Sequence, residues 1–288
     1  MNEDRIKVSV CMITYNHEFY IKQAIEGVLM QKCNFDFELV IGEDCSSDGT
    51  RNICEKYAVN NNHIRLLGNE NNLGVMPNFI RSLQACKAKY IALCEGDDYW
   101  TDPLKLQKQV NFLEANPAYS LCFHNAIIKH EGKQAKDELY FKNKISDNID
   151  IKKIIAGHGM PTASMLFKKD ALEIPFWLNY VYNGDYAIRL ILATKGTIGY
   201  LDELMTVYRK QPGGLNATMV NAKVHQHIIV LLSYFNIYTN FKYNDLIIER
   251  INSKFKEYPF ELIRDKSRLY RFLSIAYWEH RLGKTFKF

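Results

Sequence analysis

The chain of 288 residues is 47% hydrophobic and 24% charged, which is ordinary for a soluble globular protein with one substantial core and a smaller appendage. Its longest uninterrupted apolar run, IIVLL, is far too short for a membrane span, and the chain enters a strand-like pattern at once, so we expect no signal peptide. Seven cysteines without a CxxC spacing indicate reduced thiols in a cytoplasmic protein and no zinc site built on cysteine.

The first half of the chain alternates between strand and helix patterns. Apolar β-branched runs predict strands over 7–15, 37–44, 63–68 and 90–95. Helical apolar spacing and capping residues predict helices over 20–32, 46–58, 76–88 and from Pro103 onward. This alternation with short connections predicts an α/β fold with a mostly parallel sheet and helices on both faces.

From about residue 119 the pattern changes. Strands are predicted over 119–129, 162–169 and 204–210, and a strong helix over 184–196. The polar stretch 130–148 is predicted to be a loop, and His158 a surface histidine. After QPGG the chain is helical in pattern, so we expect a first domain over 1–212 and a helical extension over 213–288.

The net charge of +5 is concentrated at the C-terminal end. Residues 242–288 hold 11 Lys and Arg against 6 Asp and Glu, whereas the rest of the chain holds 26 of each. The same segment is rich in aromatic residues: Tyr258, Phe260, Tyr270, Phe272, Tyr277 and Trp278. Such a helical tail could contact an anionic membrane surface or a polyanion, and the alternative is a solvated helix face that covers the core. We expect no nucleic-acid partner.

Three polar clusters follow predicted strands: TYNH, EDCSSDG and EGDD. Ligands in such sheets bind beyond the carboxyl ends of the strands, so these clusters should converge at one edge. Glu95, Asp97 and Asp98 suit a hard divalent cation that also binds substrate phosphates, and Gly96 lets the backbone approach a ligand. The alternative is that an acid here caps the helix near Pro103, which fits Asp102 well.

The stretch DCSSDGTRNICE (44–55) also fits the spacing of a calcium-binding EF-hand loop. An EF-hand needs a helix before the loop, whereas a strand is predicted there, and Arg51 stands where an aliphatic residue is usual. A strand-to-helix turn is the better interpretation, with Asp44 presented to a ligand and Ser46, Ser47 and Asp48 capping the helix.

Four stretches in this order resemble glycosyltransferase family 2, the inverting enzymes of GT-A fold: SVCMITYNHEFYIKQAIEGVLMQ, FELVIGEDCSSDGT, GNENNLG and YIALCEGDDYWTDPLKLQKQV. The resemblance covers about residues 1–125 clearly and continues more weakly to about 210. It implies a metal-dependent enzyme, using Mn²⁺ or Mg²⁺, that transfers a sugar from a nucleotide-diphosphate donor, with UDP favoured. A glycan or lipid-linked acceptor in surface polysaccharide synthesis would fit a cytoplasmic enzyme that contacts the membrane peripherally.

The resemblance also implies residue roles. Thr14, Tyr15 and Asn16 would line the nucleotide pocket, with Asp44 hydrogen-bonding the base and Glu43 beside it. In the acidic turn, Glu95 would lie near the ribose, Gly96 between the acids, Asp97 would be the main metal ligand and Asp98 would lie close to the metal or sugar. Arg209 would lie near the diphosphate; relatives often have His two residues later, but this chain has Gln211, so no ligand is expected there.

Asp185, in YNGDY, matches the acid that serves the family as catalytic base. Inverting transfer needs one base to take the acceptor proton and a cation to stabilise the departing nucleoside diphosphate. The structural alternative for Asp185 is a helix N-cap. Two other functions stay open: a sugar-nucleotide nucleotidyltransferase, which would need a glycine-rich basic loop after the first strand, and a non-catalytic module that binds sugar nucleotides or glycans.

Overall fold

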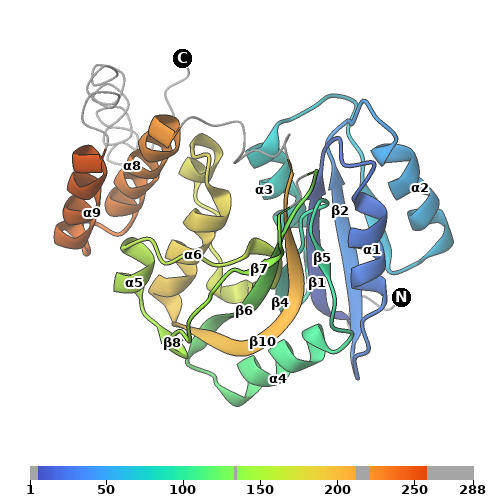
Figure 1. Ribbon diagram of the computed structural model, residues 1–288, viewed down its shortest axis with the longest axis horizontal. Helices are drawn as coiled ribbons and strands as arrows, with labels where there is room; N and C mark the ends of the chain where they lie inside the picture. Colours follow the sequence, from blue (N-terminus) through green and yellow to red (C-terminus); the bar gives the residue numbers. More distant parts are fainter. Residues whose placement is uncertain (1–5, 133–134, 212–220, 258–288) are drawn as a thin grey trace.

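The structure, a computed structural model, describes residues 6–132, 135–211 and 221–257, and shows helices on both faces of one mixed sheet (Figure 1). The strands are β1 (Ile6–Thr14), β2 (Asp36–Glu43), β3 (Ile64–Leu67), β4 (Tyr90–Leu93), β5 (Tyr99–Trp100), β6 (Tyr119–His130), β7 (Glu138–Leu139), β8 (Asn148–Ile149), β9 (Leu166–Lys168) and β10 (Thr197–Lys210). The α-helices are α1 (Ile21–Leu29), α2 (Thr50–Asn60), α3 (Val75–Ala85), α4 (Lys105–Ala115), α5 (Ile151–Ile155), α6 (Gly184–Lys195), α8 (Asn221–Tyr238) and α9 (Asn244–Glu257).

The strand order is β3-β2-β1-β4-β9-β6-β10-β5, with β7 paired to β6 and β8 to β10. The first four strands are parallel, as the strand–helix alternation predicted. Beyond β4 the sheet is mixed: β9 runs antiparallel to both β4 and β6, β6 and β10 are parallel, and β5 lies antiparallel on β10. The parallel character therefore belongs to the N-terminal half and to the β6/β10 pair.

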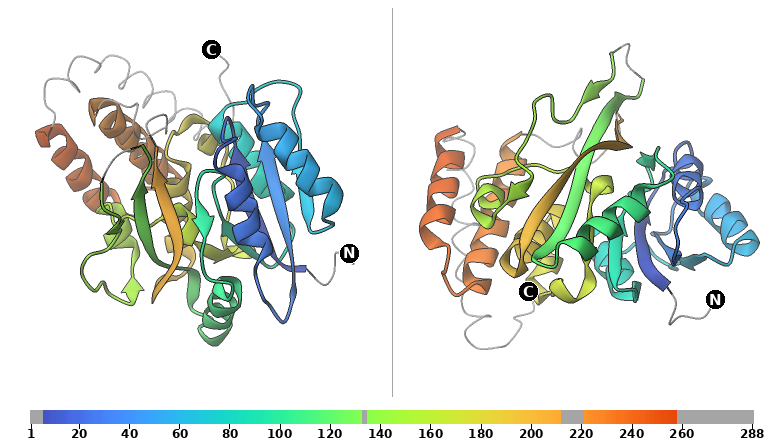
Figure 2. Two further views of the ribbon diagram at one scale, coloured as in Figure 1. Left: turned by 45° about the vertical axis from the view of Figure 1, so that its right-hand side comes forward. Right: turned by 90° about the horizontal axis from the view of Figure 1, so that it is seen from below.

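Alternation along the strands sends apolar side chains to both faces of the sheet. Val8, Val10 and Met12 of β1 pack with α1, α2 and α4, while Cys11 packs on the other face with α3 and α6. In α1 the buried positions Ile21, Ala24, Ile25 and Val28 follow the helical repeat, which explains why this face is covered. Figure 2 shows α1 and α2 on the side of the molecule that carries β1 and β2.

Several elements differ from the prediction made from local pattern. The stretch 130–148, predicted as a loop, contains β7, which pairs with β6, and α5 was not predicted. The strand predicted over 162–169 is limited to β9. β10 begins at Thr197, seven residues before the predicted strand, because its first half pairs with β6 and β8. β5 was not predicted, and it places Trp100 in the core, where the indole Nε1 donates a hydrogen bond of 2.8 Å to the Ala163 carbonyl. This buried anchor holds the chain directly after the acidic turn.

The described C-terminal helices lie beside α5 and α6, on the side away from α1 and α2 (Figures 1 and 2). None of the described helices combines the length and apolar character needed to cross a membrane. The predicted division at residues 212 and 213 falls within 212–220, outside the described residues, and stays a prediction. Most of the basic and aromatic tail, residues 258–288, also lies outside them.

Candidate functional site

The carboxyl ends of β1, β2 and β4 meet at one edge of the sheet, as predicted. The Thr14 carbonyl accepts a hydrogen bond from the Asp44 amide at 3.1 Å, and the Ile13 carbonyl accepts one from the Gly96 amide at 3.0 Å. The three polar clusters, which extend from Thr14 to Asp98 in the sequence, therefore lie next to one another in space. Thr14 is buried, whereas Tyr15 is 45% exposed beside it.

The loop after β1 is fixed to the loop after β2 by side-chain hydrogen bonds. Asn16 has a positive φ of 55°, and its Oδ1 accepts from the Ser47 amide at 2.9 Å. The amide of His17 donates to Thr50 Oγ1 at 2.7 Å, and the amide of Glu18 to Asp48 at 3.1 Å. These contacts fix the backbone of the loop that carries Tyr15, and a role of Tyr15 and Asn16 in a nucleotide pocket stays a prediction.

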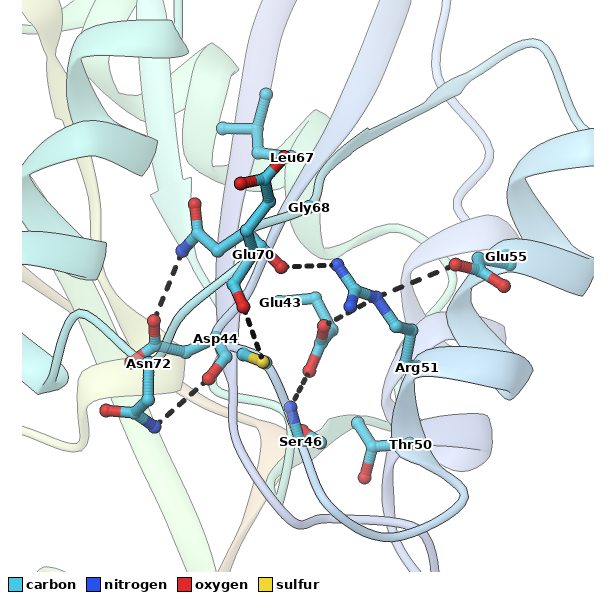
Figure 3. A network of polar contacts seen from close by, with 12 residues as sticks. Glu43, Asp44, Ser46, Thr50, Arg51, Glu55, Leu67, Gly68, Glu70 and Asn72 are labelled. Carbon is cyan, nitrogen blue, oxygen red and sulfur yellow. Dashed lines mark hydrogen bonds and ion pairs between the residues drawn. The ribbon is translucent and has the colours of Figure 1, made fainter.

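Asp44 organises the loop at residues 69–74, part of the stretch GNENNLG (Figure 3). Its Oδ1 accepts from the Leu73 amide at 2.8 Å and from Asn69 Nδ2 at 3.2 Å, and its Oδ2 accepts from the Gly74 amide at 2.9 Å. Asp44 is also buried, and β2 instead of a helix precedes it, so the stretch 44–55 is not an EF-hand. Its role in binding a base stays a prediction, for which Oδ2 retains acceptor capacity.

Glu43 is fully buried and acts within the same network (Figure 3). Its Oε1 accepts from the Ser46 amide at 2.7 Å, and its Oε2 lies 3.3 Å from Arg51 Nε. Arg51 reaches on to the Asn69 carbonyl at 2.7 Å. The pair therefore joins the loops after β2 and β3, and contact of Glu43 with a nucleotide stays a prediction.

The acidic turn, residues Glu95–Asp98, leads from β4 to β5. A Cβ atom placed on Gly96 would come 2.5 Å from Thr14 Oγ1 and 3.0 Å from His17 Nδ1. Only glycine allows this approach, so Gly96 is required for the turn to lie against the end of β1. His17, to which no individual role was assigned from the sequence, lies between Thr14 and the acids: its Nδ1 is 3.2 Å from Thr14 Oγ1.

Asp97 is partly exposed, as is Glu95, whereas Asp98 is buried. Its side chain is 22% exposed, and its Oδ2 accepts a hydrogen bond of 2.9 Å from Gln211 Nε2 and lies 3.9 Å from His17 Nε2. Gln211 therefore contacts the predicted metal ligand at a position where no role was expected. The signal in the sequence for this contact was its position two residues after Arg209, where relatives often have His.

Asp98 and Arg209 fix the turn from inside. Asp98 is buried and its Oδ1 accepts from the Arg209 amide at 2.9 Å. The Arg209 guanidinium donates to the Asp97 carbonyl at 2.7 Å, to Glu131 at 3.1 Å and to Gln23. Its Cζ also lies 4.3 Å from the centre of the Tyr99 ring. All three guanidinium nitrogens thus have protein partners, and direct contact of Arg209 with a diphosphate stays a prediction.

In the acidic turn, burial and neighbouring negative charges disfavour the ionised carboxylates, and a bound cation would offset this cost. Burial raises the pKa of Glu95 to about 8, and the charges of Asp97 and Asp185 add to the effect. Burial likewise raises the pKa of Asp98 well above its usual range, with Asp97 and Glu95 contributing. In addition, Asp98 Oδ2 is buried with no hydrogen-bond partner.

These residues fit a metal that is shared with a substrate. Within the described ranges, no three His, Cys, Asp or Glu side chains come together as a complete metal cage. Ions such as Mg²⁺ are commonly held by one or two carboxylates together with substrate phosphates and water. The exposed Asp97 carboxylate, next to the unpartnered Asp98 oxygen, matches that donor set.

A cavity of about 330 Å³ lies next to the acidic turn and contains Asp185. Glu95 borders it on the side of the turn, and residues 157–162 and the first turn of α6 form further walls. Asp185 does not cap the helix: the N-cap position is Asn183, and Asp185 Oδ2 pairs with Arg189 at 2.9 Å. Two acids 90 residues apart in sequence thus face one cavity, which the sequence alone did not establish.

The cavity also contains residues that were not predicted from the sequence to take part in the site. Arg189 is buried and holds Asp185 and the His158 carbonyl, the latter at 3.3 Å. His158 is half-buried and stacks on Phe141 with ring centres 5.6 Å apart, so it is not the predicted surface histidine. Burial lowers the pKa of His158, as do the charges of Arg189 and Lys153.

The sequence profile described as Glycosyl transferase family 2 matches residues 9–174. An uncharacterized Mycobacterium tuberculosis protein is 34% identical over 209 residues, 72% of this chain and 60% of that protein, so the chain spans less than two thirds of this relative. TuaG of Bacillus subtilis, named for a glycosyltransferase role in teichuronic acid biosynthesis, is 27% identical over 70% of this chain and 78% of its own.

Solved structures show the same fold. The crystal structure of Staphylococcus aureus TarS residues 1–349 with UDP-GlcNAc has a TM-score of 0.60 at 16% identity, covering 98% of this chain and 94% of that one. The mannosyltransferase PcManGT of Pyrobaculum calidifontis with GDP-Man and Mn²⁺ has a TM-score of 0.58 at 13% identity, covering 97% and 88%. The predicted GT-A fold with a helical C-terminal region is confirmed, and the chain belongs to glycosyltransferase family 2.

Proposed function

We propose that this protein is an inverting, metal-dependent glycosyltransferase that uses a nucleotide-diphosphate sugar, with UDP as the favoured nucleotide. The observation that carries the proposal is the shared cavity: Glu95, from the acidic turn, and Asp185 border the same space although they lie on different elements. The relatives' names and the nucleotide sugars bound to TarS and PcManGT support the donor class.

The chemistry divides between the two sides of the site. Asp97 would hold a divalent ion together with the donor diphosphate, and the ion would supply Lewis-acid stabilisation of the departing nucleoside diphosphate. Thr14, Tyr15, Asn16 and Asp44 would position the nucleotide.

On the cavity side, Asp185 would take the proton of the acceptor hydroxyl as that oxygen attacks the anomeric carbon. Arg189, bonded to both the Asp185 carboxylate and its carbonyl, would keep the carboxylate oriented. A single displacement of this kind inverts the configuration of the transferred sugar.

The first test is a thermal-shift screen of UDP, GDP, CDP and dTDP, each with Mn²⁺ and with EDTA. Stabilisation by one nucleotide only in the presence of metal would support the donor site and identify the base. We expect Asp97→Asn to lose the metal-dependent stabilisation, whereas Asp102→Asn, a nearby carboxylate that bonds the Leu104 amide, should keep it. A flat response to every nucleotide would refute the proposal.

Turnover separates an enzyme from a binding module. We expect Asp185→Asn to lower kcat by about 10²–10⁴-fold while nucleotide binding is retained, as for loss of a general base. The anomeric configuration of the product, measured by ¹H NMR, should be inverted. Binding without turnover over a broad range of acceptors would favour the non-catalytic alternative.

The acceptor is proposed to be a glycan or a lipid-linked intermediate of surface polysaccharide synthesis, reached from the cytoplasmic face of the membrane. The name of TuaG and the basic composition of residues 242–288 support this assignment. Co-sedimentation with anionic liposomes, with and without residues 258–288, would test the membrane contact. Equal sedimentation of both forms would contradict a role for that tail.

A further inference from the structure

The wall of the cavity that α9 provides carries a cation, Arg250. Its guanidinium lies against Gly157, since a Cβ atom on Gly157 would come 3.0 Å from Arg250 Cζ and 3.4 Å from its Nε. Gly157 has a positive φ of 95°, a conformation that other residues rarely adopt. The backbone at this position therefore leaves room for the guanidinium.

Arg250 has no counter-ion among the described residues. Its Nε is buried without a hydrogen-bond partner, and none of the ion pairs between described residues includes Arg250. The other charged groups of the cavity are engaged: Asp185 pairs with Arg189 at 2.9 Å, and Glu95 has a hydrogen bond with Thr162. A partly buried guanidinium without a partner costs free energy, which a bound anion would recover.

The position of Arg250 separates it from the expected site of the donor diphosphate. Asp97, the predicted metal ligand, does not line the cavity, and neither does Arg209. Glu95 lies at the border between the two regions. Tyr140, Tyr182 and Tyr208 line the cavity together with Arg250, and aromatic faces of this kind suit a sugar or polyol next to a charged group.

We infer that the cavity binds an acceptor that carries an anionic group, a phosphate or a carboxylate, and that Arg250 pairs with this group. Arginine presents a planar set of donors that matches both anions. The inference rests on the proposed function, because it assigns the cavity to the acceptor. It also gives the C-terminal helix α9 a direct part in acceptor choice.

The test uses the full chain with saturating UDP and Mn²⁺, titrated with small probes and followed by saturation-transfer NMR. Glycerol 3-phosphate is compared with glycerol, and methyl glucuronide with methyl glucoside, so that the two pairs distinguish phosphate from carboxylate. We expect one charged probe to bind about 10- to 100-fold more tightly than its neutral partner, the effect of one charge-assisted contact.

Three variants assign the preference to this guanidinium. Arg250→Met should abolish it, whereas Lys256→Met, which removes a charge from an exposed position of the same helix, should preserve it. Gly157→Ala should also abolish it, because the added methyl would occupy the space of the guanidinium without changing the charge. Gly157→Ala keeps the test decisive if Arg250→Met fails to fold.

Several outcomes would overturn the inference. Equal affinity of charged and neutral probes for the unsubstituted protein would remove the anion site, and an unchanged preference in folded Arg250→Met would assign it elsewhere. Loss of UDP binding in Arg250→Met would place this residue in the donor site. Failure of the unsubstituted protein to bind any nucleotide with Mn²⁺ would instead refute the proposed function, so the two failures are distinguishable.

Discussion

Replacement of Arg209 by Met would test whether this residue builds the acidic turn or binds the donor. The side chain is 3% exposed and its three nitrogens contact the Asp97 carbonyl, Glu131 and Gln23. Met fills much of the same space but leaves the Asp97 carbonyl and the Glu131 carboxylate without this donor. The ring of Tyr99 also loses a cation at 4.3 Å.

The magnitude follows from these contacts. Removing one partner of a buried ion pair costs about 3–5 kcal/mol, and a cation–π contact contributes about 0.5–2 kcal/mol. Because Glu131 is 25% exposed and can recover hydration, we place the total loss in free energy of unfolding at about 4 kcal/mol. Arg209→Lys keeps the charge and loses the planar fork, so about half of that loss is expected.

Urea denaturation gives the free energy of unfolding, and calorimetric titration with UDP and Mn²⁺ gives the affinity of the folded protein. The control is Arg65→Met, which removes an ion pair with Glu38 of 3.1 Å away from the site and should leave nucleotide affinity unchanged. We expect Arg209→Lys to lower both quantities, the affinity by about 10-fold through the displaced turn. An unchanged free energy of unfolding with a large loss of affinity would refute the structural role and indicate direct contact with the diphosphate.

Three further changes have defined outcomes. Gly96→Ala should lower the free energy of unfolding by about 1–3 kcal/mol, since its Cβ would lie 2.5 Å from Thr14 Oγ1. It should also abolish metal-dependent nucleotide binding in the thermal-shift assay. Retained binding would contradict the idea that the acidic turn must lie against the end of β1. Asp44→Asn should speed hydrogen exchange at the Leu73 and Gly74 amides, measured by mass spectrometry, and unchanged exchange would argue against its anchoring role. Burial lowers the pKa of Lys105 to about 7, so between pH 7 and its ordinary value near 10.5 the unfolded chain binds more protons and stability rises with pH. We therefore expect the free energy of unfolding of the unsubstituted protein, minus that of Lys105→Met, to increase by about 2 kcal/mol from pH 6.5 to 8.5. Urea denaturation at the two pH values measures this difference, and a difference that does not change with pH would refute the lowered pKa.

The sequence determined the local elements and the edge at which the site lies. Strand β1 follows from a short run of apolar residues that is buried on both faces of the sheet. Helix α1 follows from apolar positions that repeat every three to four residues. The clusters TYNH, EDCSSDG and EGDD follow parallel neighbours, so their convergence was predictable. The family resemblance supplied the residue roles that remain to be tested.

The tertiary structure alone decided which partners these residues meet. Arg209 reaches Asp97 and Gln23 across more than 100 residues because β10 lies beside both β6 and β5, an order that no local pattern encodes. Asp185 and Arg250 line the same cavity as Glu95 only because α6 packs on β6 and β10 while α9 packs on α5 and α8. Local propensity acts over a few residues, whereas the choice of counter-ion depends on sheet order and helix packing, which are set by the whole core.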